Sequence, residues 1–97
     1  MMDYFDFTGK VVIEFYENGC LNCQMMAPII TNLEREFPYI KFYRINADLY
    51  PNLVQKYQVT SIPSLLLFRN GQKVSTIIGA KPYHILRMMI TDALAYA

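Results

Sequence analysis

The sequence lacks an excess of charge of either sign. Its nine lysines and arginines nearly balance eight aspartates and glutamates, which gives a net charge of +1, and no run of like charges occurs. Proteins that bind nucleic acids or anionic lipid surfaces carry basic patches or stripes. The balance of charge therefore argues against both nucleic acid and membrane as partners.

Long apolar segments are lacking as well. No window of the sequence approaches the ~20 apolar residues that span a bilayer. Residues 1–6 also show no basic segment followed by the apolar stretch of a signal peptide. We therefore expect a soluble, unprocessed chain in the cytoplasm.

Metal ligands and cross-links are equally scarce, with two cysteines and one histidine in 97 residues. A structural zinc site needs four ligands, which Cys20, Cys23 and His84 cannot supply, so no metal site is expected. A disulfide between the two cysteines would close a loop too short to remove much entropy from the unfolded chain. In a reducing compartment such a pair is more often reactive or metal-binding than structural.

A single α/β domain is expected over residues 1–97. No repeat or low-complexity tract divides the chain, and its hydrophobic content of 54% can supply a core. Runs of β-branched and aromatic residues predict strands, and apolar residues at helical spacing predict helices. The predicted strands are Lys10–Tyr16, Ile40–Asn46, Ser64–Arg69 and Gln72–Ile78, and the predicted helices are Leu21–Glu36, Pro51–Tyr57 and a last helix opened by Pro82.

The order of these elements predicts a three-layer sandwich. Asn70-Gly71 is typical of a two-residue hairpin turn, so the last two strands should be antiparallel. The first two strands are joined by a helix, which predicts a parallel pair with a right-handed crossover. The βαβαββα order then gives a four-stranded mixed sheet between helices. The methionines mostly fall at apolar helical positions, where we expect them to fill the core.

Three features together resemble the thioredoxin superfamily over nearly the whole chain. Cys20-x-x-Cys23 follows a strand, Ile62-Pro63 precedes a hairpin strand, and Gly79 ends that hairpin. The resemblance implies a thioredoxin fold trimmed toward the minimal, glutaredoxin-sized core, without the usual first strand. Residues 3–8 could form at most a remnant of the usual first helix.

The cysteine pair suits dithiol chemistry. Cys20 falls at the start of a helix, where unpaired N–H groups and the positive end of the helix dipole favour thiolate over thiol, so we assign it as the nucleophile. Cys23 lies one turn further on and is expected to be more buried, as the cysteine that resolves the mixed disulfide. Leu21-Asn22 adds no positive charge, which favours a reductant over an oxidant. Inert packing of both cysteines is the alternative.

Glu14 interrupts the first strand six residues before Cys20, where thioredoxins place a buried aspartate behind the resolving cysteine. The resemblance implies a proton relay, in which a buried and unpaired Glu14 takes the proton of Cys23 and returns it in the reverse direction. Alternatively, Glu14 leans out at the strand end or pairs with Arg44, which stands where thioredoxins often have a lysine.

The resemblance also implies a substrate-docking surface around the pair. Ile62-Pro63 matches the cis-proline loop of the family, whose neighbouring backbone can pair with an extended substrate. Where thioredoxins usually carry two tryptophans this chain has Tyr16 and Gly19, and it contains no tryptophan. The surface is therefore less aromatic, which favours a dedicated partner. The predicted docking residues are Tyr16, Gly19, Ile62, Pro63, Ile78, Gly79 and Ala80.

These features predict a thiol-disulfide oxidoreductase that reduces protein disulfides, with no cofactor besides the redox-active Cys20–Cys23 disulfide. Its expected partners are substrate disulfides and a reductase such as thioredoxin reductase, and we expect a monomer. One alternative is a glutaredoxin-like enzyme reduced by glutathione, although the usual Gly-Gly pair is missing near Gly79. The other is an interaction module whose cysteines do not turn over.

Overall fold

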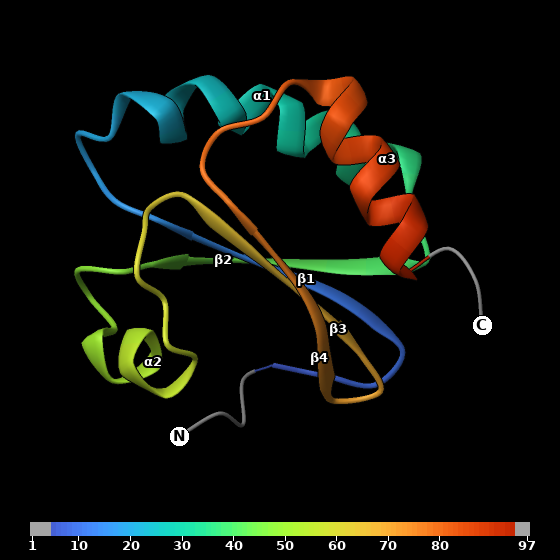
Figure 1. Ribbon diagram of the computed structural model, residues 1–97, viewed down its shortest axis with the longest axis horizontal. Helices are drawn as coiled ribbons and strands as arrows, with labels where there is room; N and C mark the ends of the chain where they lie inside the picture. The colour runs from blue at the N-terminus through green and yellow to red at the C-terminus, as the bar shows by residue number, and fades with distance from the viewer. Residues whose placement is uncertain (1–4, 95–97) are drawn as a thin grey trace.

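The computed structural model describes residues 5–94 and contains one mixed sheet with helices on both faces (Figure 1). The elements in chain order are β1 (Lys10–Tyr16), α1 (Leu21–Glu36), β2 (Ile40–Asn46), α2 (Pro51–Lys56), β3 (Ser64–Arg69), β4 (Gln72–Ile78) and α3 (Tyr83–Leu94). The four strands lie in the order β2-β1-β3-β4. Strand β1 runs parallel to β2 and antiparallel to β3, and β3 runs antiparallel to β4. The predicted α/β class and the four-stranded mixed sheet are confirmed.

The layers follow from the alternation of side chains along the strands. Val12 on β1 belongs to a buried cluster with residues of α1 and α3, whereas Val11, Ile13 and Phe15 belong to a second cluster that includes Leu53 of α2. Figure 1 shows α1 and α3 together on one side of the sheet and α2 on the other. Because both faces are covered, β1 needs apolar residues at successive positions rather than at alternate ones.

The β3–β4 hairpin turns at Asn70-Gly71, as the sequence predicts. Both residues have a positive φ, 50° and 83°, which matches a turn of type I′ and explains the need for asparagine and glycine there. The pairing register then shifts between Leu67 and Phe68, whose partners on β4 are Ser75 and Lys73. Val74 is left between these partners as the extra residue of a β-bulge.

Residues 5–8 are not helical, so not even the remnant of a first helix that the resemblance allowed is formed there, and residues 3–4 lie outside the described residues. Two aromatic rings of this segment pack against side chains of the sheet instead. The Phe5 ring meets Tyr43 edge-on at 4.9 Å between centroids, and the Phe7 ring meets Phe68 at 5.0 Å. These contacts with residues distant in the sequence, rather than local helix formation, set the path of the segment.

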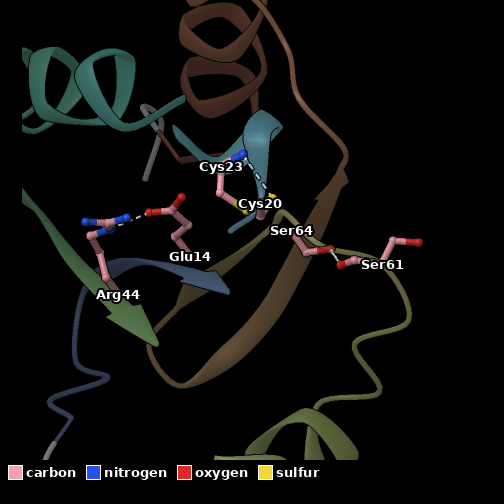
Figure 2. The surroundings of a disulfide bond; sticks show 6 residues. All are labelled: Glu14, Cys20, Cys23, Arg44, Ser61 and Ser64. Atoms are coloured by element: carbon pink, nitrogen blue, oxygen red, sulfur yellow. Dashed lines mark hydrogen bonds and ion pairs between the residues drawn. A yellow bond between two sulfur atoms is a disulfide. The ribbon is translucent and has the colours of Figure 1, made fainter. Parts of the chain in front are cut away.

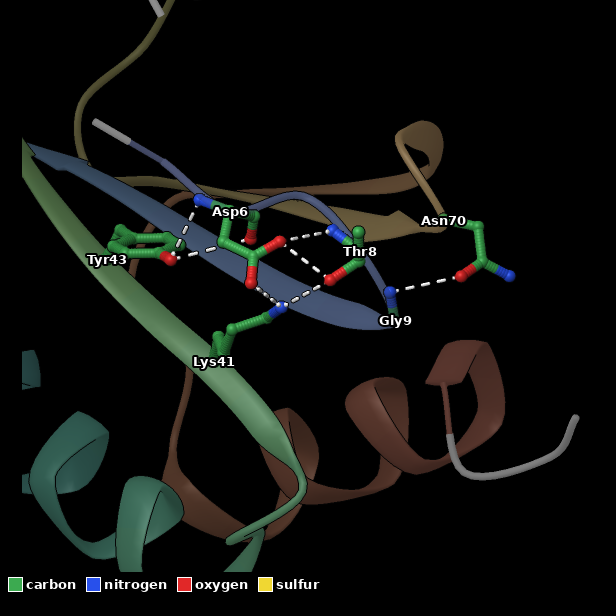
Figure 3. A network of polar contacts seen from close by, with 6 residues as sticks. All are labelled: Asp6, Thr8, Gly9, Lys41, Tyr43 and Asn70. Atoms are coloured by element: carbon green, nitrogen blue, oxygen red, sulfur yellow. Dashed lines mark hydrogen bonds and ion pairs between the residues drawn. The ribbon is translucent and has the colours of Figure 1, made fainter. Parts of the chain in front are cut away.

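Polar contacts then hold this segment to β2 and to the hairpin (Figure 3). The Asp6 carboxylate forms an ion pair with Lys41 at 3.0 Å and accepts hydrogen bonds from the backbone N–H and hydroxyl of Thr8. The N–H of Gly9 donates to Oδ1 of Asn70 at 3.0 Å. The hydrogen bonds from Thr8, with that from Lys41, lower the pKa of Asp6 from 3.8 to about 2. We call residues 5–9 with these contacts the N-terminal clasp.

Small differences from the predicted bounds concern the ends of two helices. Helix α2 ends at Lys56, and Tyr57 forms its C-cap rather than its last residue. Helix α3 begins at Tyr83, after Pro82, whose carbonyl accepts hydrogen bonds from Ile85 and Leu86 at 3.1 Å each. Within residues 5–94, no helix combines the length and the apolar character needed to cross a bilayer.

Candidate active site

Cys20 is the N-cap of α1, directly after the loop that leaves β1. Its Sγ atom accepts a hydrogen bond from the backbone N–H of Cys23 at 3.1 Å. The first turn of α1 contains no acidic residue. Free N–H groups and the helix dipole therefore create an environment that favours negative charge on the Cys20 sulfur when the pair is reduced.

The two cysteines form a disulfide bond, with their Cα atoms 5.2 Å apart (Figure 2). This separation lies within the 4.4–6.8 Å range of ordinary disulfides. The two sulfurs differ in access, because Cys20 is partly exposed whereas Cys23 is 3% exposed. An incoming molecule can therefore meet Cys20 more readily than Cys23.

Glu14 lies beneath the pair, on the α1 face of β1, and is 1% exposed. Figure 2 shows its carboxyl group on the Cys23 side of the disulfide. Oε1 accepts a hydrogen bond from Nε of Arg44 at 2.7 Å, so the expectation of an unpaired carboxylate is wrong and the alternative pairing with Arg44 is present. Oε2 is buried and has no hydrogen-bond partner among the described residues. One oxygen of Glu14 is thus held by a cation while the other stays available.

Arg44 reaches Glu14 from β2, next in the sheet, where the two residues are register partners. The guanidinium also lies over the Tyr16 ring, 4.5 Å from its centroid, which is a cation–π contact. A cavity of about 180 Å³ opens here, and its lining includes Tyr16, Gly19, Cys23 and Arg44. The buried cysteine is therefore flanked by a small hollow on the side that faces β2.

The loop before β3 and the segment after β4 are joined by a backbone hydrogen bond. The Ile62–Pro63 peptide bond is cis, and the Pro63 carbonyl accepts a hydrogen bond from the N–H of Gly79 at 2.8 Å. The Ser64 hydroxyl donates to the Ser61 carbonyl at 2.6 Å, which holds the turn that leads into Pro63 (Figure 2). Gly79 has a φ of +86°, which favours glycine.

The predicted docking residues differ in exposure. Pro63 is buried, Ile78 is 51% exposed, and the others are partly or largely exposed. Tyr16 and Gly19 line the cavity beside Cys23, whereas Ile62 lines a separate groove of about 410 Å³ that also contains Glu17. Tyr16 and Ile62 thus line different hollows, and Pro63 and Gly79 are joined through their backbones.

Two of the methionines depart from the predicted core role. Met26 is buried and Met89 packs against the core, but Met25 is 58% exposed and Met88 is 50% exposed. For these two residues the prediction is wrong, because they fall outside the stripe of α1 and α3 that faces the sheet. Met25 lies two residues after Cys23 and lines an apolar groove that the sequence reasoning missed. The sequence signal for this groove was that Met25 stands next to the buried Met26 in the helix but off the apolar stripe that faces the sheet.

Across residues 5–94 no three histidine, cysteine, aspartate or glutamate side chains gather closely enough to hold an ion.

Comparison with known proteins gives consistent matches. The thioredoxin family model matches residues 5–92. Thioredoxin-1 of Saccharomyces cerevisiae is 36% identical over 83 residues, covering 86% of this chain and 81% of the relative. A thioredoxin of Chlamydia pneumoniae is 35% identical over 88 residues, covering 91% and 86%. The oxidised crystal structure of mitochondrial thioredoxin 3 from Saccharomyces cerevisiae superposes with a TM-score of 0.82 at 34% identity, covering 88% and 79% of the two chains.

The fold, the bonded cysteine pair and these matches define a thiol-disulfide oxidoreductase, a protein that exchanges its own disulfide with those of other molecules. More specifically, the chain belongs to the thioredoxin family, because the family model covers almost all of it.

Proposed function

We propose that this oxidoreductase reduces protein disulfides, with Cys20 as the nucleophile and Cys23 as the resolving cysteine. The observation that carries this assignment is the asymmetry of the pair. Cys20 is partly exposed and stands at the N-terminus of α1, whereas Cys23 is 3% exposed and donates its backbone N–H to the Cys20 sulfur. A thiolate is the attacking species in disulfide exchange, and the helix terminus stabilises it on Cys20.

The reaction balances as a two-electron exchange. The Cys20 thiolate attacks one sulfur of the substrate disulfide, that bond breaks, and the departing substrate sulfur takes up a proton. The Cys23 sulfur then attacks Cys20 in the mixed disulfide and releases the second substrate thiol. The substrate gains two electrons and two protons, and Cys20 and Cys23 end as the disulfide of Figure 2.

Glu14 is the proposed proton acceptor for the Cys23 thiol in the second step. Its carboxylate is buried on the Cys23 side, and Oε2 has no partner among the described residues, so this oxygen can accept a proton. The hydrogen bond from Arg44 to Oε1 fixes the orientation of the carboxyl group. In the opposite direction Glu14 returns the proton to Cys23.

The surroundings of the pair support a reductant that works with a disulfide reductase. Leu21 and Asn22 carry no charge, so they add nothing to the stabilisation of the thiolate by the helix terminus, which favours a reductant over a strongly oxidising pair. Substrates would dock across Tyr16, Gly19, Ile62, Pro63, Ile78, Gly79 and Ala80. We also propose that the protein is a monomer in the cytoplasm, where a reductase such as thioredoxin reductase supplies its electrons.

Reduction of insulin disulfides tests the function and its electron donor together. The protein is assayed with dithiothreitol, with thioredoxin reductase and NADPH, and with glutathione. We expect turnover with the first two donors and little with glutathione. Turnover with glutathione alone would favour the glutaredoxin-like alternative. Cys20→Ser is expected to be inactive, and equal inactivity of the wild type with all three donors would contradict the proposal.

A further inference from the structure

An apolar groove lies beside the active site, between α1 and the segment that joins β4 to α3. It is lined by Met25, Met26, Ile29, Ala80, Lys81 and Pro82 and has a volume of about 370 Å³. Figure 1 shows the segment after β4 passing close to α1 on its way to α3. A groove of this size is at the lower end of small-molecule sites and has room for a large side chain.

The groove is continuous with the surface that surrounds the disulfide. Ala80 lines it and directly follows Gly79, whose N–H is bonded to the Pro63 carbonyl. Exposed apolar side chains extend this surface, because Leu21 is 69% exposed and Ile78 is 51% exposed. A polypeptide that meets Cys20 and runs past Gly79 toward Ala80 therefore reaches the groove.

The spacing matches an extended peptide. Met25 lies five residues beyond Cys20, which corresponds to a rise of about 7.5 Å along a helix axis. In an extended chain, residues two apart are about 7 Å from one another and their side chains point to the same side. When an extended substrate runs along α1 with its cysteine facing Cys20, the side chain two residues away is therefore level with Met25 along the helix axis.

The charge of the lining limits which side chains fit. Of the described residues that line the groove, Lys81 alone carries a charge, and its ammonium group donates to the Ile78 carbonyl at 3.0 Å. An apolar side chain entering the groove would meet thioether and aliphatic surface, whereas a lysine or arginine would bring a second positive charge near Lys81 and lose water without gaining a partner.

We propose that this groove selects polypeptide disulfides that carry an aliphatic or aromatic side chain two residues from the reacting cysteine. The inference rests on the proposed function, since it assigns a substrate class to the same cysteine pair. It places Met25 at the centre of the selection, because its thioether is flexible and adapts to side chains of different shape.

Peptides with one cysteine test the preference. Each peptide is joined through a disulfide to thionitrobenzoate, and release of this coloured thiol by the reduced protein is followed in a single turnover. Leucine, phenylalanine, glycine or lysine occupies the position two residues before or two residues after the cysteine. At one of these positions we expect leucine and phenylalanine to react about tenfold faster than glycine, the lower end of discrimination by an apolar pocket. Lysine should react more slowly than glycine.

Met25→Ser and Met88→Ser form a matched pair, because both methionines are helical and similarly exposed, and Met88 does not line the groove. Met25→Ser should reduce the ratio of leucine to glycine rates to threefold or less, and Met88→Ser should keep it. Equal rates for leucine and glycine at both positions, or an unchanged ratio in Met25→Ser, would overturn the inference.

Two further measurements separate the other outcomes. The wild-type protein is tested with the symmetrical thionitrobenzoate disulfide, which has no side chain for the groove. If the protein reduces this compound but shows no preference among the peptides, the inference about the groove alone is overturned. If the protein does not reduce this compound, the proposed function is contradicted. Sedimentation tests whether a second copy of the chain fills the groove, and a dimer abolished by Met25→Ser would overturn the assignment to substrate.

Discussion

Arg44 donates from Nε to Oε1 of Glu14 across 2.7 Å, joining a side chain that is 45% exposed to one that is 1% exposed (Figure 2). The buried carboxylate is thereby compensated from the surface of the neighbouring strand. Removing one member of such a pair leaves a charge in the core without its partner, which costs more than the pair itself contributes.

Arg44→Met is expected to lower the free energy of unfolding by about 2 kcal/mol, below the usual cost for fully buried pairs because water can reach the arginine. Urea denaturation at neutral pH measures the change. Arg44→Lys keeps a positive charge and serves as the control, with a smaller loss. A second control, Glu14→Gln combined with Arg44→Met, should recover part of the stability. Wild-type stability in Arg44→Met would contradict a role for the pair.

Glu14→Gln tests the proposed proton transfer with little change of shape. The amide cannot accept the proton of Cys23, so release of the second substrate thiol should slow by at least about tenfold at neutral pH. The attack by Cys20 should keep its rate, because Cys20 is partly exposed and this step does not use the proton of Cys23. Rapid mixing of reduced protein with a peptide disulfide resolves the two phases.

The pH profile distinguishes this role from a structural one. As the pH rises, more of the Cys23 thiol ionises without help, so the difference between Glu14→Gln and wild type should shrink. A difference that stays constant across the pH range would point to altered packing instead.

Cys23→Ser is expected to leave the first step intact and to block the second. Substrates should then remain attached to Cys20 as mixed disulfides, which non-reducing electrophoresis and mass spectrometry detect after capture from cells. The double variant Cys20→Ser/Cys23→Ser is the control for nonspecific binding. Capture of equal amounts by both variants would be inconsistent with Cys20 as the nucleophile.

Asp6→Asn tests the N-terminal clasp. The folded chain holds the pKa of Asp6 at about 2, below its ordinary value of 3.8, chiefly through hydrogen bonds from Thr8. The charged carboxylate therefore stabilises the fold above pH 3.8, and this contribution is lost as the pH falls toward 2. Wild type should lose more stability than Asp6→Asn over this interval in acid denaturation followed by circular dichroism.

Asp92→Asn is the matched control for the clasp, since Asp92 is an exposed aspartate on α3. Its acid profile should follow that of wild type. If Asp6→Asn and wild type lose stability in parallel between pH 4 and 2, the contacts of Asp6 do not stabilise the fold.

The sequence predicts the strands and helices well because each carries strong local signals. The apolar run of β1, the Asn70-Gly71 turn and the apolar stripe of α1 are all readable without knowledge of distant partners. The position of Cys20 at the helix start follows from the same local pattern. This is why the fold class and the cysteine pair could be predicted together.

Contacts between distant segments were less accessible to prediction. Phe7 meets Phe68 across 61 positions of sequence, and no local pattern distinguishes that packing from a short helix. The pairing of Glu14 with Arg44 could be suggested but not decided, because it depends on the register of β1 and β2. The groove beside Met25 arises only where α1 passes the segment after β4, so composition and spacing could not reveal it.

The bulge at Val74 has a consequence for how other chains can approach the molecule. Strand β4 lies at an edge of the sheet, where unpaired backbone groups could recruit a further strand from another polypeptide. The extra residue bends the strand and interrupts the regular spacing of those groups, which discourages stacking of copies into fibres. On β4 the unbroken portion of the edge is the part that ends at Ile78, so a strand that adds to β4 would pair with that end, next to the Gly79–Pro63 backbone contact.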